Sequence, residues 1–308
     1  IAVGMATNMA PHNLIEVVQA AKHLLEHPDA TVDDLMAFVP GPDLPGGGIV
    51  AGLDGVRDAY ATGRGSFKTR AKASIERAGR KTQLVFTELP YLVGPERVIE
   101  KIKDGVQSKR LQGLSDVQDL TDRKHGLRLV VDLKSGFSPE AVLEQLYRVT
   151  PLEDGFSINA VALVDGTPRT LGLVDLLRVY LDHRLQVVRR RSAFRLRKAQ
   201  ERLHLVEGLL IAIVDIDEVI QVIRSSEDTA QARTRLQDVF DLSEVQAEYI
   251  LELRLRRLTR FSRIELEQEA DELRARITEL QRILAEPGLL RRVVADELDE
   301  VAERFGTP

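Results

Sequence analysis

Apolar and small residues recur every three or four positions through the second half of this chain, and this spacing limits its possible folds more than any other pattern. The residues on this spacing are Leu173, Leu177, Leu181, Leu185, Val188, Ser192, Leu196, Ala199, Leu203, Val206, Leu210 and Ile213. The spacing predicts one α-helix of about 40 residues, roughly 60 Å long at 1.5 Å per residue. Because an isolated helix of that length is unstable, it needs a partner along its apolar stripe.

A second helical stripe later in the sequence supplies that partner. Its apolar residues alternate between spacings of four and three, which is typical of a coiled-coil seam: Leu266, Ala270, Leu273, Ile277, Leu280 and Leu284. Pro287 and Gly288 follow the seam. We therefore expect a long antiparallel coiled coil.

The residues between the two stripes, about 214–261, predict a compact cluster of short helices. One covers 216–225, the next is capped by Ser226 or Asp228, and the last runs over 243–258 with Ser243 as its N-cap. An apolar helical cluster at the end of a two-helix stalk would be exposed in a monomer. We therefore expect a two-fold dimer in which this cluster forms the contact. The alternative is a helical hairpin that folds back on its own domain.

The first half, up to about residue 170, mixes short strands, turns and helices, which indicates the α+β class. Asn13 is a candidate N-cap, with Glu16 three residues later, for a helix from Leu14 toward His27. The other predicted helices cover 95–106 and 139–149, and the predicted strands include 49–51, 127–133 and 158–164.

Alternation over 66–75 and 82–88, with a turn at Ala78-Gly79, predicts a β-hairpin. Its cations lie on one face, so the hairpin would be basic on that side. These cations are Arg64, Lys68, Arg70 and Lys72.

The net charge of −5, from 43 Lys and Arg against 48 Asp and Glu, argues at first against a nucleic-acid-binding protein. The distribution of charge along the chain instead favours nucleic-acid binding. Residues 57–81 hold eight basic and two acidic residues, and residues 174–205 hold nine basic and three acidic ones. Residues 262–308 hold twelve acids and seven bases. Their net charge of −5 equals that of the whole chain. The sum therefore hides two basic surfaces, although either could be simply a solvated face.

Other features exclude whole classes of protein. The absence of cysteine rules out disulfides, thiol catalysis and cysteine-ligated zinc. No apolar run approaches the roughly 20 residues of a membrane span, and the absence of a basic-then-apolar pattern leads us to expect no signal peptide. The histidines are too scattered to predict a metal site, and there is no Walker A loop. Because the sequence begins at Ile1 rather than Met, we expect a fragment of a longer, cytoplasmic protein with no membrane partner.

Several segments closely resemble the A subunits of bacterial type IIA topoisomerases, the gyrase and topoisomerase IV family. These segments are Ile1–Asn8, Pro11–Leu14, Thr62–Gly65, Glu88–Tyr91, Gly126–Arg128, His183–Ala199, Asp217–Ile220 and Ile250–Leu258. The resemblance is collinear over essentially all 308 residues. It implies the end of a DNA-gate region in 1–30, a mixed α/β tower domain in 31–170, and the coiled coil with a helical dimerisation gate (the C-gate) in 171–308.

Enzymes of this family cut both strands of one duplex, pass another duplex through and reseal the break by means of a tyrosine nucleophile. The resemblance places that tyrosine before Ile1, so we expect no catalytic residue and no activity in this chain alone. The five tyrosines are interpreted as packing residues. No cofactor or metal is expected here, because the family carries its Mg²⁺ and ATP sites on the partner B subunit.

The resemblance also implies DNA contacts. Ile1 aligns with the residue that wedges between base pairs and kinks the duplex, where the alternative is ordinary packing of an apolar loop. The expected phosphate-binding residues are Arg64, Lys68, Arg70 and Lys72. The run Arg189, Arg190 and Arg191 would line the path of the transported duplex, unless it is only solvated.

The expected partners are double-stranded DNA, a second copy of the chain and a topoisomerase B subunit. The competing hypothesis is a non-catalytic DNA-binding coiled-coil dimerisation scaffold. The sequence does not distinguish gyrase from topoisomerase IV.

Overall fold

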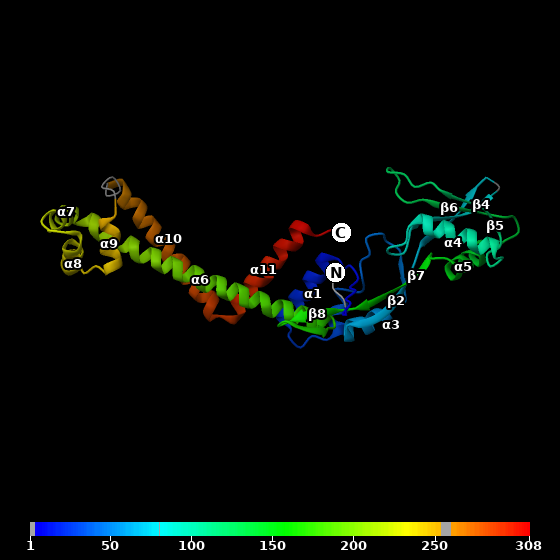
Figure 1. Cartoon of the computed structure of the whole chain (residues 1–308), viewed down its shortest axis with the longest axis horizontal. Coiled ribbons are helices and arrows are strands. Elements are labelled where there is room, and N and C mark those ends of the chain that lie inside the picture. Colours follow the sequence, from blue (N-terminus) through cyan, green and yellow to red (C-terminus); the bar gives the residue numbers. More distant parts are fainter. Residues whose placement is uncertain (1–3, 80, 254–259) are drawn as a thin grey trace. The chain divides into compact units, whose positions relative to one another are not determined.

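The computed structural model describes residues 4–79, 81–253 and 260–308, and the chain divides into two compact units (Figure 1). The first unit comprises residues 1–181 and 297–308, and the second comprises residues 182–296. Each unit is described by itself. Within the described residues, none of the helices combines the length and the apolar character required to span a bilayer.

The first unit contains a helical part in which the helix beginning at Leu14 contacts the C-terminal residues 297–308. Its helices are α1 (Leu14–Glu26), α2 (Val32–Met36), α3 (Asp54–Thr62) and the end of α11 (Pro287–Phe305). The Asn13 side chain caps α1 by accepting hydrogen bonds from the N–H groups of Ile15 and Glu16, as predicted. Its amide also donates to the Thr307 carbonyl, 294 positions away, and Lys22 Nζ lies 2.6 Å from Asp299 Oδ2.

A three-stranded antiparallel sheet in the first unit has the order β1-β2-β7. Its strands are β1 (Ile49–Ala51), β2 (Arg64–Arg70) and β7 (Glu153–Asn159). Strands β8 (Val161–Val164) and β9 (Thr167–Thr170) form a separate antiparallel pair.

A four-stranded sheet in the same unit has the order β3-β4-β6-β5 and carries two helices (Figure 1). Its elements are β3 (Lys72–Ala78), β4 (Lys81–Glu88), α4 (Pro95–Gln107), β5 (Leu114–Asp119), β6 (Leu129–Leu133) and α5 (Pro139–Val149). Phe86 and Leu129 from the sheet share one core with Ile102 of α4 and Leu146 of α5. The apolar faces of both helices are therefore buried against this sheet.

Two predicted strands prove to be broken. The predicted hairpin is present as β3 and β4, which pair in antiparallel fashion with Ala78 opposite Lys81, but its predicted basic face is wrong. The 66–75 segment divides at Ala71, which is buried and donates its N–H to the Leu152 carbonyl at 2.7 Å. The residues before Ala71 form β2 in one sheet, and those after it form β3 in the other. The 158–164 segment divides at Ala160, whose N–H donates to the Gly63 carbonyl.

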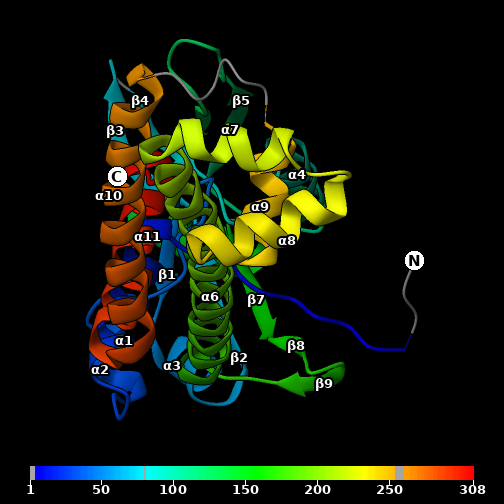
Figure 2. The same ribbon diagram turned by 90° about the vertical axis from the view of Figure 1, so that its left-hand side faces the viewer.

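The long helix α6 (Leu173–Val214) begins in the first unit, and most of it belongs to the second. Its 42 residues confirm the predicted length. Helix α10 (Arg260–Ala285) runs beside it in the opposite direction (Figures 1 and 2). The short helices between them are α7 (Ile216–Arg224), α8 (Thr229–Phe240) and α9 (Glu244–Leu251). Asp228 rather than Ser226 caps α8, and Ser243 caps α9 as predicted. Helix α9 ends at Leu251 with Glu252 as its C-cap, so the predicted helix does not continue through Glu252 and Leu253. The rest of its predicted extension, 254–258, lies outside the described residues.

The short helices pack around an apolar core that they share with the end of α6. Leu209 and Ala212 of α6 pack with Val219, Val222, Leu236, Leu242, Ala247 and Ile250. The predicted α+β class, a mixed α/β part followed by a long helix with an antiparallel partner helix, is thus confirmed. The supercoiling of α6 with α10 and the proposed domain bounds remain predictions.

Candidate nucleic-acid interface and helical gate

The exposed face of β2 carries three of the four cations that the sequence placed together. Arg64, Lys68 and Arg70 alternate along the strand with Phe67 and Thr69, which are buried beneath it. Residues two apart on a strand point to the same side, so the three cations share one face.

Helix α3 packs closely against β2 and fixes the position of this face. A Cβ added to Gly55 would overlap the Ser66 carbonyl oxygen, and one added to Gly65 would overlap the Gly55 carbonyl oxygen. The close approach of the two backbones therefore requires glycine at both positions.

Two of the β2 cations share a single carboxylate on the neighbouring strand. Lys68 Nζ lies 2.7 Å from Glu153 Oε1, and Arg70 Nε lies 2.6 Å from Glu153 Oε2. The hydrogen bond from Lys68, followed by that from Arg70, lowers the pKa of Glu153 below its ordinary value. Within the part of the chain that the structure describes, the Arg64 side chain makes no hydrogen bond or ion pair.

Lys72 belongs to a different sheet from the other three cations, which corrects the predicted single face. It begins β3, and its Nζ lies 3.1 Å from Glu88 Oε1. The other oxygen of Glu88 accepts the Gly48 N–H at 2.6 Å, and this bond is the main reason that the pKa of Glu88 is lowered.

The remaining predicted DNA-binding residues lie elsewhere. Ile1 is outside the described residues. Arg189, Arg190 and Arg191 lie on α6 in the second unit, where Arg189 and Arg190 are exposed and Arg191 is half-buried. Among the described residues, no group of three or more His, Asp or Glu side chains could hold a metal ion.

An apolar cavity of about 210 Å³ in the first unit contains one polar pair. His12 Nε2 and the Tyr60 hydroxyl are 2.7 Å apart, and His12 Nδ1 is 2.8 Å from the Ala10 carbonyl. Burial lowers the pKa of His12 and raises that of Tyr60. Both groups are therefore held neutral, Tyr60 as a phenol and His12 as an imidazole, and the pair joins the loop before α1 to α3.

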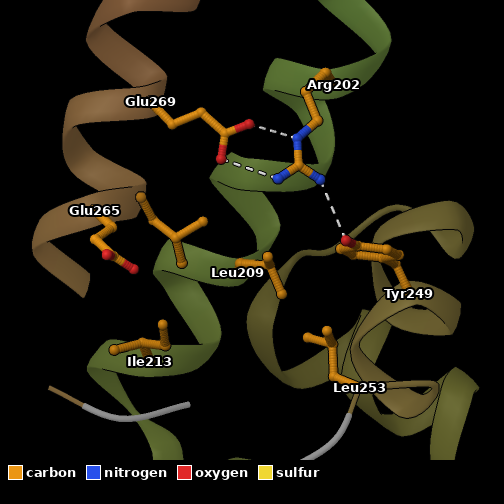
Figure 3. Close-up of a pocket in the computed structure, with 8 residues that line it drawn as sticks. Arg202, Leu209, Ile213, Tyr249, Leu253, Glu265 and Glu269 are labelled. Carbon is orange, nitrogen blue, oxygen red and sulfur yellow. Dashed lines mark hydrogen bonds and ion pairs between the residues drawn. The ribbon is translucent and has the colours of Figure 1, made fainter. Parts of the chain in front are cut away.

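In the second unit, one arginine joins three helices (Figure 3). Arg202 of α6 forms two hydrogen bonds to the Glu269 carboxylate of α10, at 2.6 and 2.9 Å, and a third of 3.2 Å to the Tyr249 hydroxyl of α9. The ion pair raises the pKa of Arg202 and lowers that of Glu269. Beside it lies a cavity of about 260 Å³, lined by Arg202, Leu209, Ile213, Tyr249, Leu253, Glu265, Leu266 and Glu269.

Helix α9 also contacts α6 directly through a buried glutamine. Gln246 Nε2 donates to the His204 carbonyl at 2.6 Å, and His204 Nε2 is 2.6 Å from Ser243 Oγ. A Cβ added to Gly208 would lie 2.8 Å from Gln246 Cγ. Gly208 therefore permits the two helices to approach each other.

Sequence reasoning missed the partners of the cations. Glu153 and Glu269 are separated from them by 83 and 67 positions, and neither carboxylate stands out in the sequence. Only strand register and helix pairing bring these groups together, so no local pattern could have identified them.

Comparison with known proteins relates nearly the whole chain to one family. The family model that describes the A subunits of DNA gyrase and topoisomerase IV matches residues 1–299. The DNA gyrase A subunit of Staphylococcus epidermidis (strain ATCC 12228) is 45% identical over 307 residues, which cover 99% of this chain and 34% of the relative. That of Staphylococcus aureus (strain MRSA252) is also 45% identical over 307 residues, covering 99% and 35%.

The chain thus spans about a third of the length of the curated relatives it matches. The match includes both the β2 cations and the helices of the second unit. The chain belongs to the family of DNA gyrase and topoisomerase IV A subunits.

Proposed function

We propose that this chain is the DNA-bending and exit-gate portion of the breakage–reunion subunit of an ATP-dependent type II DNA topoisomerase. Such an enzyme passes one duplex through a transient double-strand break in another. The observation that carries the proposal is the match to gyrase A subunits along nearly the entire chain. It covers a cation-bearing sheet and a helical hairpin, the two parts that such a role requires.

The proposed DNA contacts are the β2 cations Arg64, Lys68 and Arg70, together with Lys72 on β3. Lysine and arginine bind phosphates without reading sequence, which suits an enzyme that acts on any duplex. Ile1 is proposed as the wedge that kinks the duplex, and Arg189–Arg191 as part of the path of the transported duplex.

The proposed exit gate consists of α7, α8 and α9. These helices bury a core of their own, yet Val239 and Val245 are 49% and 61% exposed. A second copy of the chain packed on this end would remove these side chains from water, at about 25 cal/mol per Å² of apolar surface. The gate is therefore proposed to be a two-fold dimer contact.

No residue of this chain is proposed as catalytic. The nucleophilic tyrosine would come from a preceding segment, and a partner B subunit would bind Mg²⁺ and ATP. The described residues offer no cluster of metal ligands. The chain would contribute the binding of DNA and the closing of the gate.

The activity is tested by placing this chain in a full-length A subunit, to which the B subunit, ATP and Mg²⁺ are then added. We expect supercoiled, relaxed or catenated plasmid to change topology, as seen by gel electrophoresis. Complete inactivity of a well-folded assembly would favour the non-catalytic scaffold instead.

The gate is tested by sedimentation of the chain with Val245→Asp, which places a charge on the exposed apolar surface of α9. We expect the wild-type chain to be a dimer and the variant to shift toward monomer. Leu163→Asp is the matched control, since Leu163 is 71% exposed on β8 in the other unit. A monomeric wild-type chain would contradict the gate.

The wedge is tested by fluorescence energy transfer between the ends of a bound duplex in the assembled enzyme. Ile1→Ala should reduce the bend, and an unchanged bend would remove this role from Ile1.

A further inference from the structure

Glu153 occupies a central position among the proposed DNA-binding residues of β2. Its two carboxylate oxygens each accept a hydrogen bond from a different cation, Lys68 at 2.7 Å and Arg70 at 2.6 Å. Lys68 and Arg70 carry two positive charges, and Glu153 removes one of them. Arg70 Nη1 also lies 4.0 Å from Glu144 Oε1 on α5, so the cluster presents a net charge of at most about +1 rather than +2 to a phosphate.

The register of the sheet holds Glu153 in this place. It lies directly opposite Arg70 across the β2–β7 ladder, and Gly155 lies opposite Lys68. A Cβ added to Gly155 meets no atom within 4 Å, so the space beside Lys68 is open. Lys68 can therefore reach along the strand to Glu153 or turn outward to a phosphate.

The three side chains differ in their exposure. The Glu153 side chain is only 13% exposed, whereas those of Lys68 and Arg70 are 66% and 38% exposed. The carboxylate is thus held beneath the two cations. The Arg70 guanidinium also lies 5.0 Å from the centre of the Tyr147 ring, which restricts its orientation further.

A phosphate on this face would compete with Glu153 for the same N–H donors. Once bound by both cations, it would also lie close to a carboxylate of like charge, which opposes binding. The same carboxylate has a favourable effect, because it keeps two flexible cations ordered on one face before DNA arrives.

We propose that Glu153 is a positioning residue that orders Lys68 and Arg70 and lowers their affinity for phosphate, so that a bound duplex can be released. This inference rests on the proposed DNA contact of β2. It assigns a role in DNA affinity to an acidic residue that does not itself touch DNA.

The test is Glu153→Gln, which keeps the shape of the side chain and removes its charge. Binding of the chain to a fluorescently labelled duplex is followed by anisotropy over a range of salt concentrations. We expect binding about fivefold tighter at low salt, from the loss of one like charge near the phosphate. The slope of log affinity against log salt should steepen by up to about 0.9 if one more phosphate contact forms.

Two controls separate this effect from simple changes in net charge or in folding. Glu272→Gln on α10 changes the total charge equally in the other unit and should alter affinity by less than about twofold. Glu153→Asp retains the charge and should bind close to wild type. Thermal unfolding of each variant identifies any that fail to fold.

A double-variant comparison tests whether Glu153 acts through the two cations. In a Lys68→Ala/Arg70→Ala background, adding Glu153→Gln should leave DNA affinity unchanged. A purely structural role would not produce this dependence. Unchanged or weaker binding by a well-folded Glu153→Gln variant would overturn the inference.

Failure of the underlying DNA contact gives a different result. If Lys68→Ala/Arg70→Ala binds the duplex as tightly as wild type, the β2 face is not a DNA contact and the proposed function is wrong in that respect. If that pair weakens binding but Glu153→Gln does not strengthen it, only the role of Glu153 is wrong.

Discussion

The Arg202 guanidinium and the Glu269 carboxylate form a bidentate ion pair, with Nε–Oε1 and Nη2–Oε2 distances of 2.6 and 2.9 Å. The third nitrogen of the same guanidinium donates to Tyr249 on α9. A single side chain thus holds the last short helix of the proposed gate against α6 and α10 (Figure 3). Arginine suits this position because its planar group presents several donors in fixed directions.

Replacement of Arg202 by Met should loosen this junction, because it leaves Glu269 and Tyr249 without their donor. We expect a loss of about 1–2 kcal/mol in unfolding free energy, since the pair is half-exposed. Urea denaturation measures this loss, and hydrogen exchange should be faster in the amides of α9. Arg274→Met, which removes the more exposed ion pair to Glu207, is the control and should cost less. Equal costs would mean that Arg202 has no special role.

The same ion pair predicts a dependence of stability on pH. Since Arg202 lowers the pKa of Glu269 below its ordinary value of 4.5, the folded chain binds this proton less readily than the unfolded chain. The stabilisation is therefore complete above about pH 4.5 and is lost as the pH falls through the lowered pKa. Denaturation of Glu269→Gln should lack this component, and identical pH profiles would contradict the assignment.

His12 should produce a second acid-sensitive contribution at higher pH. Burial lowers its pKa below the ordinary value of 6.5, so the unfolded chain takes up a proton that the folded chain resists. Stability should be fully present above about pH 6.5 and decrease as the pH falls toward the lowered pKa. The His12→Gln variant should show a flatter profile in this window. NMR titration of the His12 ring gives an independent check, and an unshifted pKa would contradict the prediction.

Gly208 should be intolerant of even a methyl group, although alanine is the better helix former. A Cβ there would lie 2.9 Å from Gln246 Cβ, and it would push α9 away from α6. We expect Gly208→Ala to destabilise the chain by about 1 kcal/mol or more in urea denaturation. The matched control is Gly288→Ala in α11, where an added Cβ meets no atom within 4 Å and the change should be neutral or stabilising. Stabilisation by Gly208→Ala would show that α9 does not pack as described.

Elements whose causes are local could be predicted from the sequence. The apolar spacing over 173–213 predicted α6, since a helix repeats every 3.6 residues wherever its stripe is buried. Asn13 and Ser243 were identifiable as caps because a cap hydrogen-bonds to backbone groups two or three residues away. The helix over 139–149 was predicted to the residue, and the structure shows Ser138 as its N-cap.

Features that depend on residues far apart in the sequence became visible only in the fold. Alternation continues through Ala71, so no local pattern reveals that the chain changes sheets there; the hydrogen bond to Leu152 does. Glu153 meets Arg70 because of strand register, and Arg202 meets Glu269 because α6 and α10 run antiparallel. Such pairings are fixed by the packing of the whole unit. The sequence therefore revealed the cations and the helices, and the fold revealed which acids hold them.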